Sequence, residues 1–320
     1  MSEEKTLQYM PLMRNVGPSR SGWKEDQRID ADIRTQWIND GFTVLKGVYD
    51  QQDIDEYNRV VASERAVIAD GKDQFGYGDR IGQLHQKHPS LLKLAGDQRI
   101  IDLLSWALDD EPVVFGSLNF ERGTEQEAHI DAIFFWPEPV YSMAGVWIAL
   151  EDVDPTAGPL FYIPGSHQWP FFHSEDVVRT RPELAARRLR ARSDATEVDS
   201  VVGDLGNAWT EDLKNLQQKY DSPRITLPIK AGDVVVWHSL LAHGGSARQD
   251  LTRSRRSAVF HYIGAHTSLY TTQQFFLRNR DELSREPAQP MNLKRYNSTR
   301  YMSYPYFVSY SDGQQVVHQL

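Results

Sequence analysis

The middle of this chain is a series of short β-prone segments separated by turn residues, and this pattern limits the fold more than any other feature. The segments lie at residues 112–120, 128–135, 142–153, 160–163, 224–229, 233–238 and 256–263. Helix-type periodicity comes before them. Short strands after N-terminal helices predict a mainly β protein with flanking helices. Its core is expected to be a double-stranded β-helix of the jelly-roll or cupin-like kind.

The composition gives no clear linker, so we expect one domain over residues 1–320. Within it we predict an N-terminal arm (1–27), a helical part (28–110), a β core (111–265) and a C-terminal extension (266–320). Residues 170–222 are charged and helix-prone or loop-like, which predicts a lid-like insertion into the core. In the helical part, helices are predicted from about Asp30, from Asp53 as a cap, and from about Asp97.

The composition excludes several classes of site. Cysteine is absent, so disulfides, thiolate metal sites and iron–sulfur clusters are excluded, and a metal would need His, Asp or Glu. The formal charge of −9 argues against nucleic acid as a partner. No apolar run is long enough to span a membrane, and the first residues hold no apolar stretch. We expect a cytoplasmic protein with a small-molecule substrate; the sequence does not predict its oligomeric state.

His129 and Asp131 form the strongest local feature. Residues i and i+2 of a strand point to the same face, so an imidazole and a carboxylate would project side by side. This pair supplies two-thirds of the facial triad of two histidines and one carboxylate that binds ferrous iron. The pattern alone is weak, because a strand histidine that is hydrogen-bonded to a neighbour would look the same.

Two further histidines follow much later, in the segment AGDVVVWHSLLAHGGS at residues 231–246. A turn at Gly232-Asp233 and a buried strand lead to His238, and His243 comes five positions after it. On the residues alone either histidine could be the third ligand, and both could equally line the end of a strand.

Arg255 is a candidate for binding an anion. In TRSRRSAVFHY (residues 252–262) it shares one strand face with Ser257 and His261, whereas Arg256 shares the other face with Phe260. A basic group inside an apolar barrel needs an anionic partner, because a lone buried charge is very costly. A guanidinium matches a carboxylate. A surface arginine in a basic run is the alternative.

Taken together, these segments resemble the phytanoyl-CoA dioxygenase (PhyH) family of iron(II)/2-oxoglutarate-dependent oxygenases. The resemblance runs from about Trp37 to Tyr262. It is carried by WINDGFTVLKGVYDQQDID, GTEQEAHID, GVWIALEDV, TAGPLFYIPGSH, and AGDVVVWHSLLAHGGS followed by SRRSAVFHY. The order and spacing of these segments are far more specific than any one of them alone.

The resemblance implies the metal ligands. His129 and Asp131 match the first two iron ligands of the family, and His243 matches the third. His238 is then a structural residue or one that contacts the ligands. The implied cofactors are Fe(II), 2-oxoglutarate as cosubstrate, and O2.

The resemblance also implies a cosubstrate site. Arg255 matches the residue that binds the distal carboxylate of 2-oxoglutarate, and Ser257 could add a hydroxyl donor to it. Trp147 matches an aromatic wall beside the cosubstrate, with plain core as the alternative. Where Gly245 stands, the family usually has a hydroxyl residue. The gap from His243 to Arg255 is also one residue longer than the family's, which leaves Arg256 as an alternative.

The implied activity is hydroxylation of an unactivated C–H bond of a small metabolite or natural-product intermediate. Desaturation, epimerisation or ring closure would use the same residues. Halogenation replaces the carboxylate ligand with a small residue, so Asp131 argues against it. A non-catalytic cupin-like binding module is a further alternative, and the complete set of residues argues against that too.

Other residues are candidates for the substrate pocket. Phe134-Phe135-Trp136 follows the metal segment, and half of it should be core because neighbours on a strand face opposite ways. Arg80, Gln83 and Asn119 lie in segments expected to approach the site. The segment PGSH at residues 164–167 predicts a turn rather than a catalytic serine, because no Gly-x-Ser-x-Gly elbow lies nearby.

Overall fold

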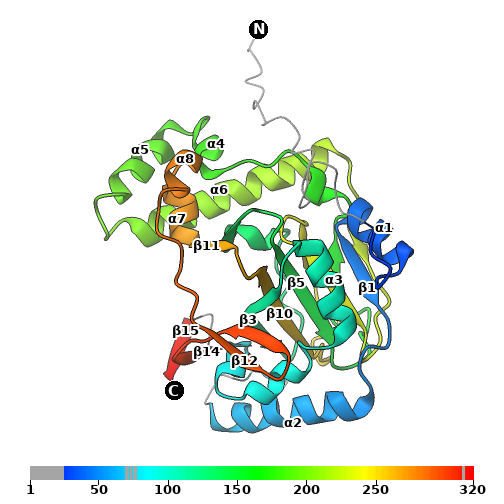
Figure 1. Ribbon diagram of the computed structural model, residues 1–320. Helices are drawn as coiled ribbons and strands as arrows, with labels where there is room; N and C mark the ends of the chain where they lie inside the picture. The colour runs from blue at the N-terminus through cyan, green and yellow to red at the C-terminus, as the bar shows by residue number, and fades with distance from the viewer. Residues whose placement is uncertain (1–24, 69–71, 73, 75–77, 312–313) are drawn as a thin grey trace.

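The computed structural model describes residues 25–68, 72, 74, 78–311 and 314–320, so the predicted N-terminal arm lies outside the described residues up to position 24. The helical part contains α1 (Ala31–Asp40), α2 (Gln51–Val67) and α3 (Gln98–Leu108), close to the predicted ranges (Figure 1). Aspartate side chains cap all three by accepting a backbone N–H. One predicted cap is wrong: Asp50 caps α2, and Asp53 lies in the first turn with its N–H bonded to Asp50.

The largest sheet joins strands from distant parts of the chain in the order β1-β8-β5-β10-β3-β2-β14-β15, and β13 pairs with both β3 and β12. Its strands are β1 (Phe42–Leu45), β8 (Val234–His238), β5 (Met143–Ala149), β10 (Ser257–Gly264), β3 (Pro112–Phe120), β2 (Ile81–Gly82), β14 (Tyr306–Ser311), β15 (Gln314–Gln319), β12 (Leu293–Tyr296) and β13 (Thr299–Met302). The predicted C-terminal extension therefore contributes strands to the main sheet.

Two small sheets complete the β structure. One has the order β7-β6-β9 and the other pairs β11 with β4. Their strands are β7 (Ile225–Thr226), β6 (Leu160–Tyr162), β9 (His243–Gly245), β11 (Ser268–Thr271) and β4 (Phe135–Glu138). Together with the main sheet they form a jelly-roll core with flanking helices, which confirms the predicted fold class.

Alternation along the central strands separates two apolar cores. On β5, Val146 and Ile148 pack into a cluster with the apolar side chains of α1, α2 and α3. Trp147 and Ala149 point to the opposite face and pack with Tyr162 of the β7-β6-β9 sheet. The helices therefore cover the outer face of the main sheet, and the inner face is left to form the interior of the jelly roll.

Residues 170–222 are more helical than the sequence predicts. They form α4 (Ser174–Val178), α5 (Pro182–Ala191) and α6 (Val198–Lys219), which pack with α7 (Thr272–Leu277) and α8 (Arg280–Leu283) into a helical layer (Figure 1). Val201, Leu205, Trp209 and Leu213 recur every fourth residue of α6 and are buried in this layer. Because many polar residues separate these apolar residues, their helical period is hard to detect in the sequence. Among the described residues, no helix is both long and apolar enough to cross a membrane.

Candidate active site

His129 and His243 lie opposite each other on neighbouring segments. Each backbone N–H donates to the other residue's carbonyl oxygen at 3.0 Å, so the two residues form one rung of a β-ladder. The Nδ1 of His129 lies 2.9 Å from the Glu127 carbonyl, and the Nδ1 of His243 lies 3.0 Å from the Leu241 carbonyl. A carbonyl only accepts, so Nδ1 carries the proton and Nε2 presents a lone pair.

Asp131 completes the cluster, although its local structure differs from the prediction. Residues 128–135 do not form the predicted strand: Asp131 begins the short 3-10 helix η3 (Asp131–Ile133), and β4 starts at Phe135. Extended backbone at Ile130 still brings the side chains of His129 and Asp131 together. Asp131 Oδ1 lies 3.7 Å from Nε2 of both His129 and His243.

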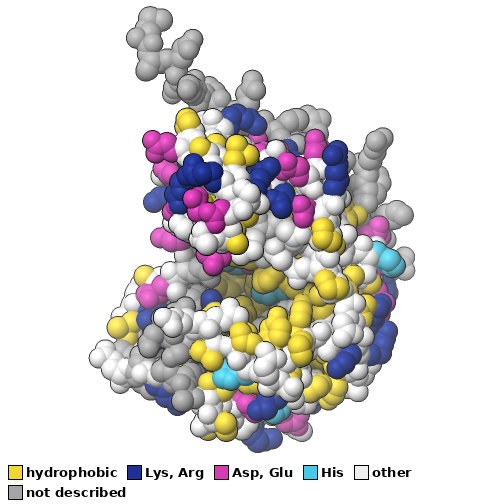
Figure 2. All heavy atoms as spheres, turned by 90° about the vertical axis from the view of Figure 1, so that its left-hand side faces the viewer, with side chains coloured by type: hydrophobic (Ala, Val, Ile, Leu, Met, Phe, Trp, Pro, Cys, Tyr) yellow, Lys and Arg dark blue, Asp and Glu magenta, His cyan; other side chains and the backbone are white. Residues whose placement is uncertain are grey.

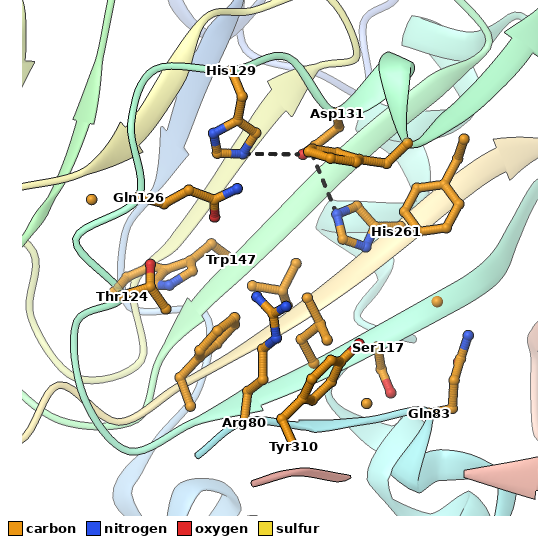
Figure 3. A pocket seen from close by; sticks show the side chains of 18 of the residues that line it. Arg80, Gln83, Ser117, Thr124, Gln126, His129, Asp131, Trp147, His261 and Tyr310 are labelled. Atoms are coloured by element: carbon orange, nitrogen blue, oxygen red, sulfur yellow. Dashed lines mark ion pairs between the residues drawn. The ribbon is translucent and has the colours of Figure 1, made fainter. Parts of the chain in front are cut away.

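The second oxygen of Asp131 is held by two other side chains. The indole N–H of Trp237 donates to Oδ2 at 2.8 Å. The Nε2 of His261 lies 3.4 Å from the same oxygen (Figure 3). Oδ1 is therefore the oxygen that faces the two histidines. The candidate ligand atoms of His129, Asp131 and His243 all lie within 4.8 Å of one another, and all three residues are buried.

Electrostatics favour the metal-binding protonation states of His129 and Asp131. Burial and the nearby His243 lower the pKa of His129 to about 4. Burial alone would raise the pKa of Asp131, but the facing histidines outweigh it and hold that pKa below its ordinary value. At neutral pH the cluster therefore offers an ionised carboxylate and a neutral His129. Two imidazoles and one carboxylate on one side fit a ferrous ion with open positions.

Arg255 lies in the same cavity with its side chain 1% exposed. Its guanidinium donates to the Gly158 carbonyl at 2.8 Å, Nε is buried without a partner, and no described carboxylate is within ion-pair distance. Burial lowers its pKa to about 10, so it remains charged at neutral pH. Arg256 points outward, with its side chain 51% exposed, toward Glu151. The geometry therefore favours Arg255 as the anion-binding residue.

The two other predicted cosubstrate residues are placed differently. The ring of Trp147 lines the cavity, 5.9 Å from the Arg255 guanidinium carbon, and its indole N–H is buried without a partner among the described residues. Ser257 is fully buried on β10 behind the lining residues, and its hydroxyl also lacks a described partner. Trp147 can contact a ligand directly, whereas Ser257 is not part of the cavity wall.

These residues share a cavity of about 510 Å³. Figure 2 shows a hollow between the helical layer, which bears many charged side chains, and the rest of the molecule, with apolar side chains inside it. The lining residues come from both the β core and the C-terminal strands. They include Arg80, Gln83, Ser117, Thr124, Gln126, Phe134, Phe135, Thr272, Tyr306, Val308, Tyr310 and Gln315. No residue of 170–222 is among the described lining residues; the helical layer reaches the cavity at Thr272 of α7.

Several predicted candidates lie away from this cavity. His238 is buried on the other face of β8, where its Nδ1 accepts from the Leu240 N–H at 3.0 Å. The amide of Asn119 bonds to Tyr57 and to the Ile81 carbonyl, so it is structural. Trp136 is core, as expected for part of its aromatic triplet.

The PGSH segment also has a structural role. The Ser166 hydroxyl accepts from the Ala242 N–H at 2.8 Å, next to His243. The Nε2 of His167 lies 3.2 Å from the Ile38 carbonyl. The predicted turn therefore positions the segment that carries His243.

Sequence reasoning missed the side chains that hold Asp131. The sequence predicts only that His261 shares a strand face with Arg255 and that Trp237 lies in a strand; it does not predict that either residue contacts Asp131. Trp237 needs a glycine opposite it, because a Cβ at Gly145 would lie 2.3 Å from the indole ring. Gly245, where the family usually has a hydroxyl residue, has a similar reason: a Cβ there would lie 2.9 Å from the Glu125 backbone nitrogen.

The fold and the donor set define a class, the jelly-roll oxygenases that use non-haem iron(II) and 2-oxoglutarate. The chain belongs to the phytanoyl-CoA dioxygenase (PhyH) family, whose sequence model matches residues 37–257. Phytanoyl-CoA dioxygenase domain-containing protein 1 of Mus musculus is 26% identical over 258 residues, covering 78% of this chain and 75% of the mouse protein. The ectoine dioxygenase of Sphingopyxis alaskensis is 27% identical over 162 residues, covering 46% and 53%.

Solved structures share the fold. The carbocyclase SnoK from nogalamycin biosynthesis superposes with a TM-score of 0.58 at 18% identity, covering 85% of this chain and 96% of SnoK. EctD from S. alaskensis in its apoform gives 0.59 at 19% identity, covering 85% and 89%. EctD has also been solved with 2-oxoglutarate and 5-hydroxyectoine. The protein is thus a non-haem iron, 2-oxoglutarate-dependent oxygenase with Fe(II), 2-oxoglutarate and O2 as its cofactors, as the sequence predicts.

Proposed function

We propose that this oxygenase hydroxylates an unactivated C–H bond of a small metabolite or natural-product intermediate. In this proposal His129, Asp131 and His243 hold Fe(II), and Arg255 binds the distal carboxylate of 2-oxoglutarate. The observation that carries it is a buried guanidinium with no described carboxylate partner, in the same cavity as three converging ligand atoms. A lone buried charge is costly, so this site is suited to a dianionic cosubstrate that also reaches a metal.

The residues around the proposed metal ligands have separate roles. When bound, the iron and 2-oxoglutarate activate dioxygen for attack on a C–H bond. The Glu127 and Leu241 carbonyls fix the imidazole tautomers, and Trp237 with His261 keeps Asp131 Oδ1 turned to the metal position. Trp147 covers the Arg255 guanidinium and limits water around the far carboxylate. The aromatic side chains of Phe134 and Phe135 contact the substrate.

A small substrate fits the size of the site. The cavity of about 510 Å³ lies in the range of small-molecule sites, about 300–1,000 Å³. Solved proteins with this fold carry small organic ligands, 5-hydroxyectoine in EctD and nogalamycin RO in the epimerase SnoN. The carboxylate ligand argues against halogenation, because it leaves no ligand position for a halide. Hydroxylation is distinguished from desaturation, epimerisation and ring closure by transfer of one oxygen atom from dioxygen to the product.

The proposal is tested first without a substrate. Iron-dependent conversion of 2-oxoglutarate to succinate should occur in the wild-type protein and disappear in Asp131→Ala. A panel of candidate metabolites is then screened by mass spectrometry under isotopically labelled dioxygen, in buffer that contains bromide. Incorporation of one labelled oxygen atom supports the proposal. A brominated product, or succinate formation that survives Asp131→Ala, would contradict it.

A further inference from the structure

The cavity has a second wall, opposite the metal cluster, that the proposed chemistry does not use. We call it the far wall, and define it by Arg80 and Gln83, which flank β2, by Ser117 of β3, and by Tyr306 and Tyr310 of β14. Strand β14 pairs with β2, and the Tyr310 N–H donates to the Arg80 carbonyl at 3.2 Å. These backbone contacts keep the side chains of the far wall together.

Arg80 is the charged group of the far wall. Its guanidinium carbon lies 4.3 Å from the centroid of the Tyr310 ring, and Figure 3 shows the side chain pointing into the cavity. Stacking on an aromatic ring holds a guanidinium in one orientation and leaves its N–H edge free for a ligand. The side chain forms no hydrogen bond or ion pair with any described residue. The half-buried guanidinium of Arg80 therefore has a fixed position in the cavity and can bind an anionic ligand.

The acidic groups close to Arg80 do not pair with it. Arg80 and Tyr310 also line a smaller neighbouring cavity that contains Asp79, Glu121 and Glu125, and the Asp79 carboxylate forms no ion pair with Arg80. Glu121 is 3.3 Å from Nε of Arg65 and accepts from the Gly78 N–H at 2.7 Å, and Glu125 pairs with Arg248. Neither glutamate pairs with Arg80.

The sum of the charges in the cavity also favours an anionic ligand. Among the described lining residues Asp131 is the one carboxylate. In the proposed loaded site, the ferrous ion, Asp131, Arg255 and dianionic 2-oxoglutarate sum to zero charge. Arg80 therefore adds one positive charge that nothing in the loaded site balances. A cavity with one unbalanced cation favours a ligand that brings one negative charge.

Gln83 adds a second recognition element. Its backbone adopts φ +59°, a left-handed conformation that is uncommon for residues other than glycine. The side-chain Nε2 donates to the Phe115 carbonyl at 3.2 Å, which turns Oε1 away as an acceptor, buried and without a described partner. An N–H or O–H group of a ligand would satisfy this oxygen.

We propose that the substrate is a monocarboxylate with an apolar body, and that its carboxylate is bound by Arg80 on the far wall. This inference rests on the proposed function, because it assigns the Arg255 end of the cavity to 2-oxoglutarate. The fork of Arg80 receives the carboxylate, Gln83 Oε1 accepts from a neighbouring donor group, and the aromatic side chains hold the apolar body between the far wall and the metal cluster.

The test uses matched pairs of probes that differ in charge alone. Benzoate, phenylacetate and 3-phenylpropionate are each compared with their carboxamides, on protein that carries Zn(II) and saturating 2-oxoglutarate so that the Arg255 end is filled. Binding is measured by ligand-observed saturation-transfer NMR, which needs no turnover. At least one carboxylate should bind about tenfold more tightly than its amide, as expected for a charge-assisted hydrogen bond. Equal binding of every pair, or no binding of any carboxylate, overturns the proposal.

Two variants locate the effect. Arg80→Gln should remove the preference for carboxylate over amide, and Arg80→Lys should keep part of it. Arg256→Gln removes an exposed charge and should leave the preference unchanged. A carboxylate preference that survives Arg80→Gln overturns the proposal.

The affinity for 2-oxoglutarate separates this proposal from the proposed function. If Arg80→Gln weakens 2-oxoglutarate binding and Arg255→Ala does not, Arg80 is the cosubstrate residue and both proposals fail. If Arg255→Ala alone weakens it, the proposed function stands whatever the probes show.

Discussion

The metal end of the cavity and the far wall are built in opposite ways. At the metal end, Nδ1 of His129 and of His243 are hydrogen-bonded, and Oδ2 of Asp131 is held by Trp237. At the far wall, Arg80 stacks on an aromatic ring but has no described hydrogen-bond or ion-pair partner. Bonded groups keep one geometry, whereas unbonded polar groups await a ligand. The hydrogen bonds at the metal end set its geometry before a ligand binds, whereas the proposed recognition by Arg80 is completed only by the ligand.

The two regions differ in part in where they lie along the chain. The three candidate ligands and Arg255 lie within residues 37–257, the part that matches the family, and so do Arg80, Gln83 and Ser117 of the far wall. Strand β14 follows that part, yet it supplies Tyr306 and Tyr310 to the cavity. Members of one family can therefore share the metal end while a later segment alters the far wall.

Removing a proposed metal ligand should have the largest effect. We expect His243→Ala to abolish both iron binding and 2-oxoglutarate turnover, because one imidazole and one carboxylate hold ferrous iron weakly. Iron content by atomic absorption and succinate by mass spectrometry measure the two effects. His238→Ala is the matched control, since that histidine lies outside the cavity and should leave iron binding intact. The reverse result would show that the wrong histidine was chosen.

Arg255→Ala should weaken 2-oxoglutarate binding by about tenfold to a hundredfold, the loss expected for one charge-assisted contact. Iron affinity should change little, because the guanidinium does not contact the ligands. Calorimetric titration of 2-oxoglutarate into the Zn(II)-loaded protein gives the affinity. Arg256→Ala serves as the neighbour control. A loss in Arg256→Ala rather than in Arg255→Ala would move the cosubstrate site by one residue.

Trp237→Phe should lower metal affinity by about tenfold. The change removes the N–H that holds Asp131 Oδ2, and loss of such a partner costs about 10–100-fold in metal affinity. We expect the low end because His261 still lies 3.4 Å from the same oxygen. Competition with a chelator measures the affinity. Unchanged metal affinity would mean that Asp131 is positioned without its indole partner.

A further effect concerns pH and the far wall. His85 lies beneath it, with Nδ1 2.7 Å from the hydroxyl oxygen of Ser117, and burial lowers its pKa from 6.5 to about 3. Between pH 6.5 and about pH 3, His85 is protonated in the unfolded chain but remains neutral in the folded protein. Its contribution to the free energy of unfolding is therefore full above pH 6.5 and decreases as the pH falls. This residue should contribute a slope of about 1.4 kcal/mol per pH unit between those two pKa values.

Urea unfolding at several pH values from 7.5 to 5 measures the total slope, to which His129, His167 and His173 also contribute because burial lowers their pKa values. His85→Gln removes one titrating group and should flatten the curve by the contribution of His85, whatever it does to stability at pH 7.5. Identical slopes in the wild-type protein and His85→Gln would show that His85 is not held neutral by burial.

The metal end could be predicted in more detail than the far wall. His129, Asp131, His243 and Arg255 stand in segments whose order resembles a known family, and the structure brings all four to one cavity. The predicted reason for the first pair was partly wrong, since an extended Ile130 before a 3-10 turn, rather than a continuous strand, sets their spacing. Their roles as ligands and anion-binding residue remain predictions.

The far wall could not be assembled from the sequence. Tyr306 and Tyr310 meet Arg80 only through the pairing of β14 with β2, two segments far apart in the chain. Strand β2 is two residues long, and β12–β15 lack a clear alternation of apolar and polar side chains, so period-based prediction had little to detect. Non-local pairing of short strands also explains why Gln83 and Arg80 were single candidates in the sequence and form one wall in the structure.

If His129 and His243 bind iron as proposed, the rung that joins them links the lifetime of the protein to the supply of metal. The two residues lie far apart in the sequence and meet only in the folded chain, so an ion that binds both of them is bound by the native state alone. Mass action then adds about 2.7 kcal/mol of stability when free metal is at a hundred times its dissociation constant. Under metal starvation this contribution disappears, and a larger fraction of molecules is open to proteases. The abundance of the enzyme, and not its activity alone, would then follow iron.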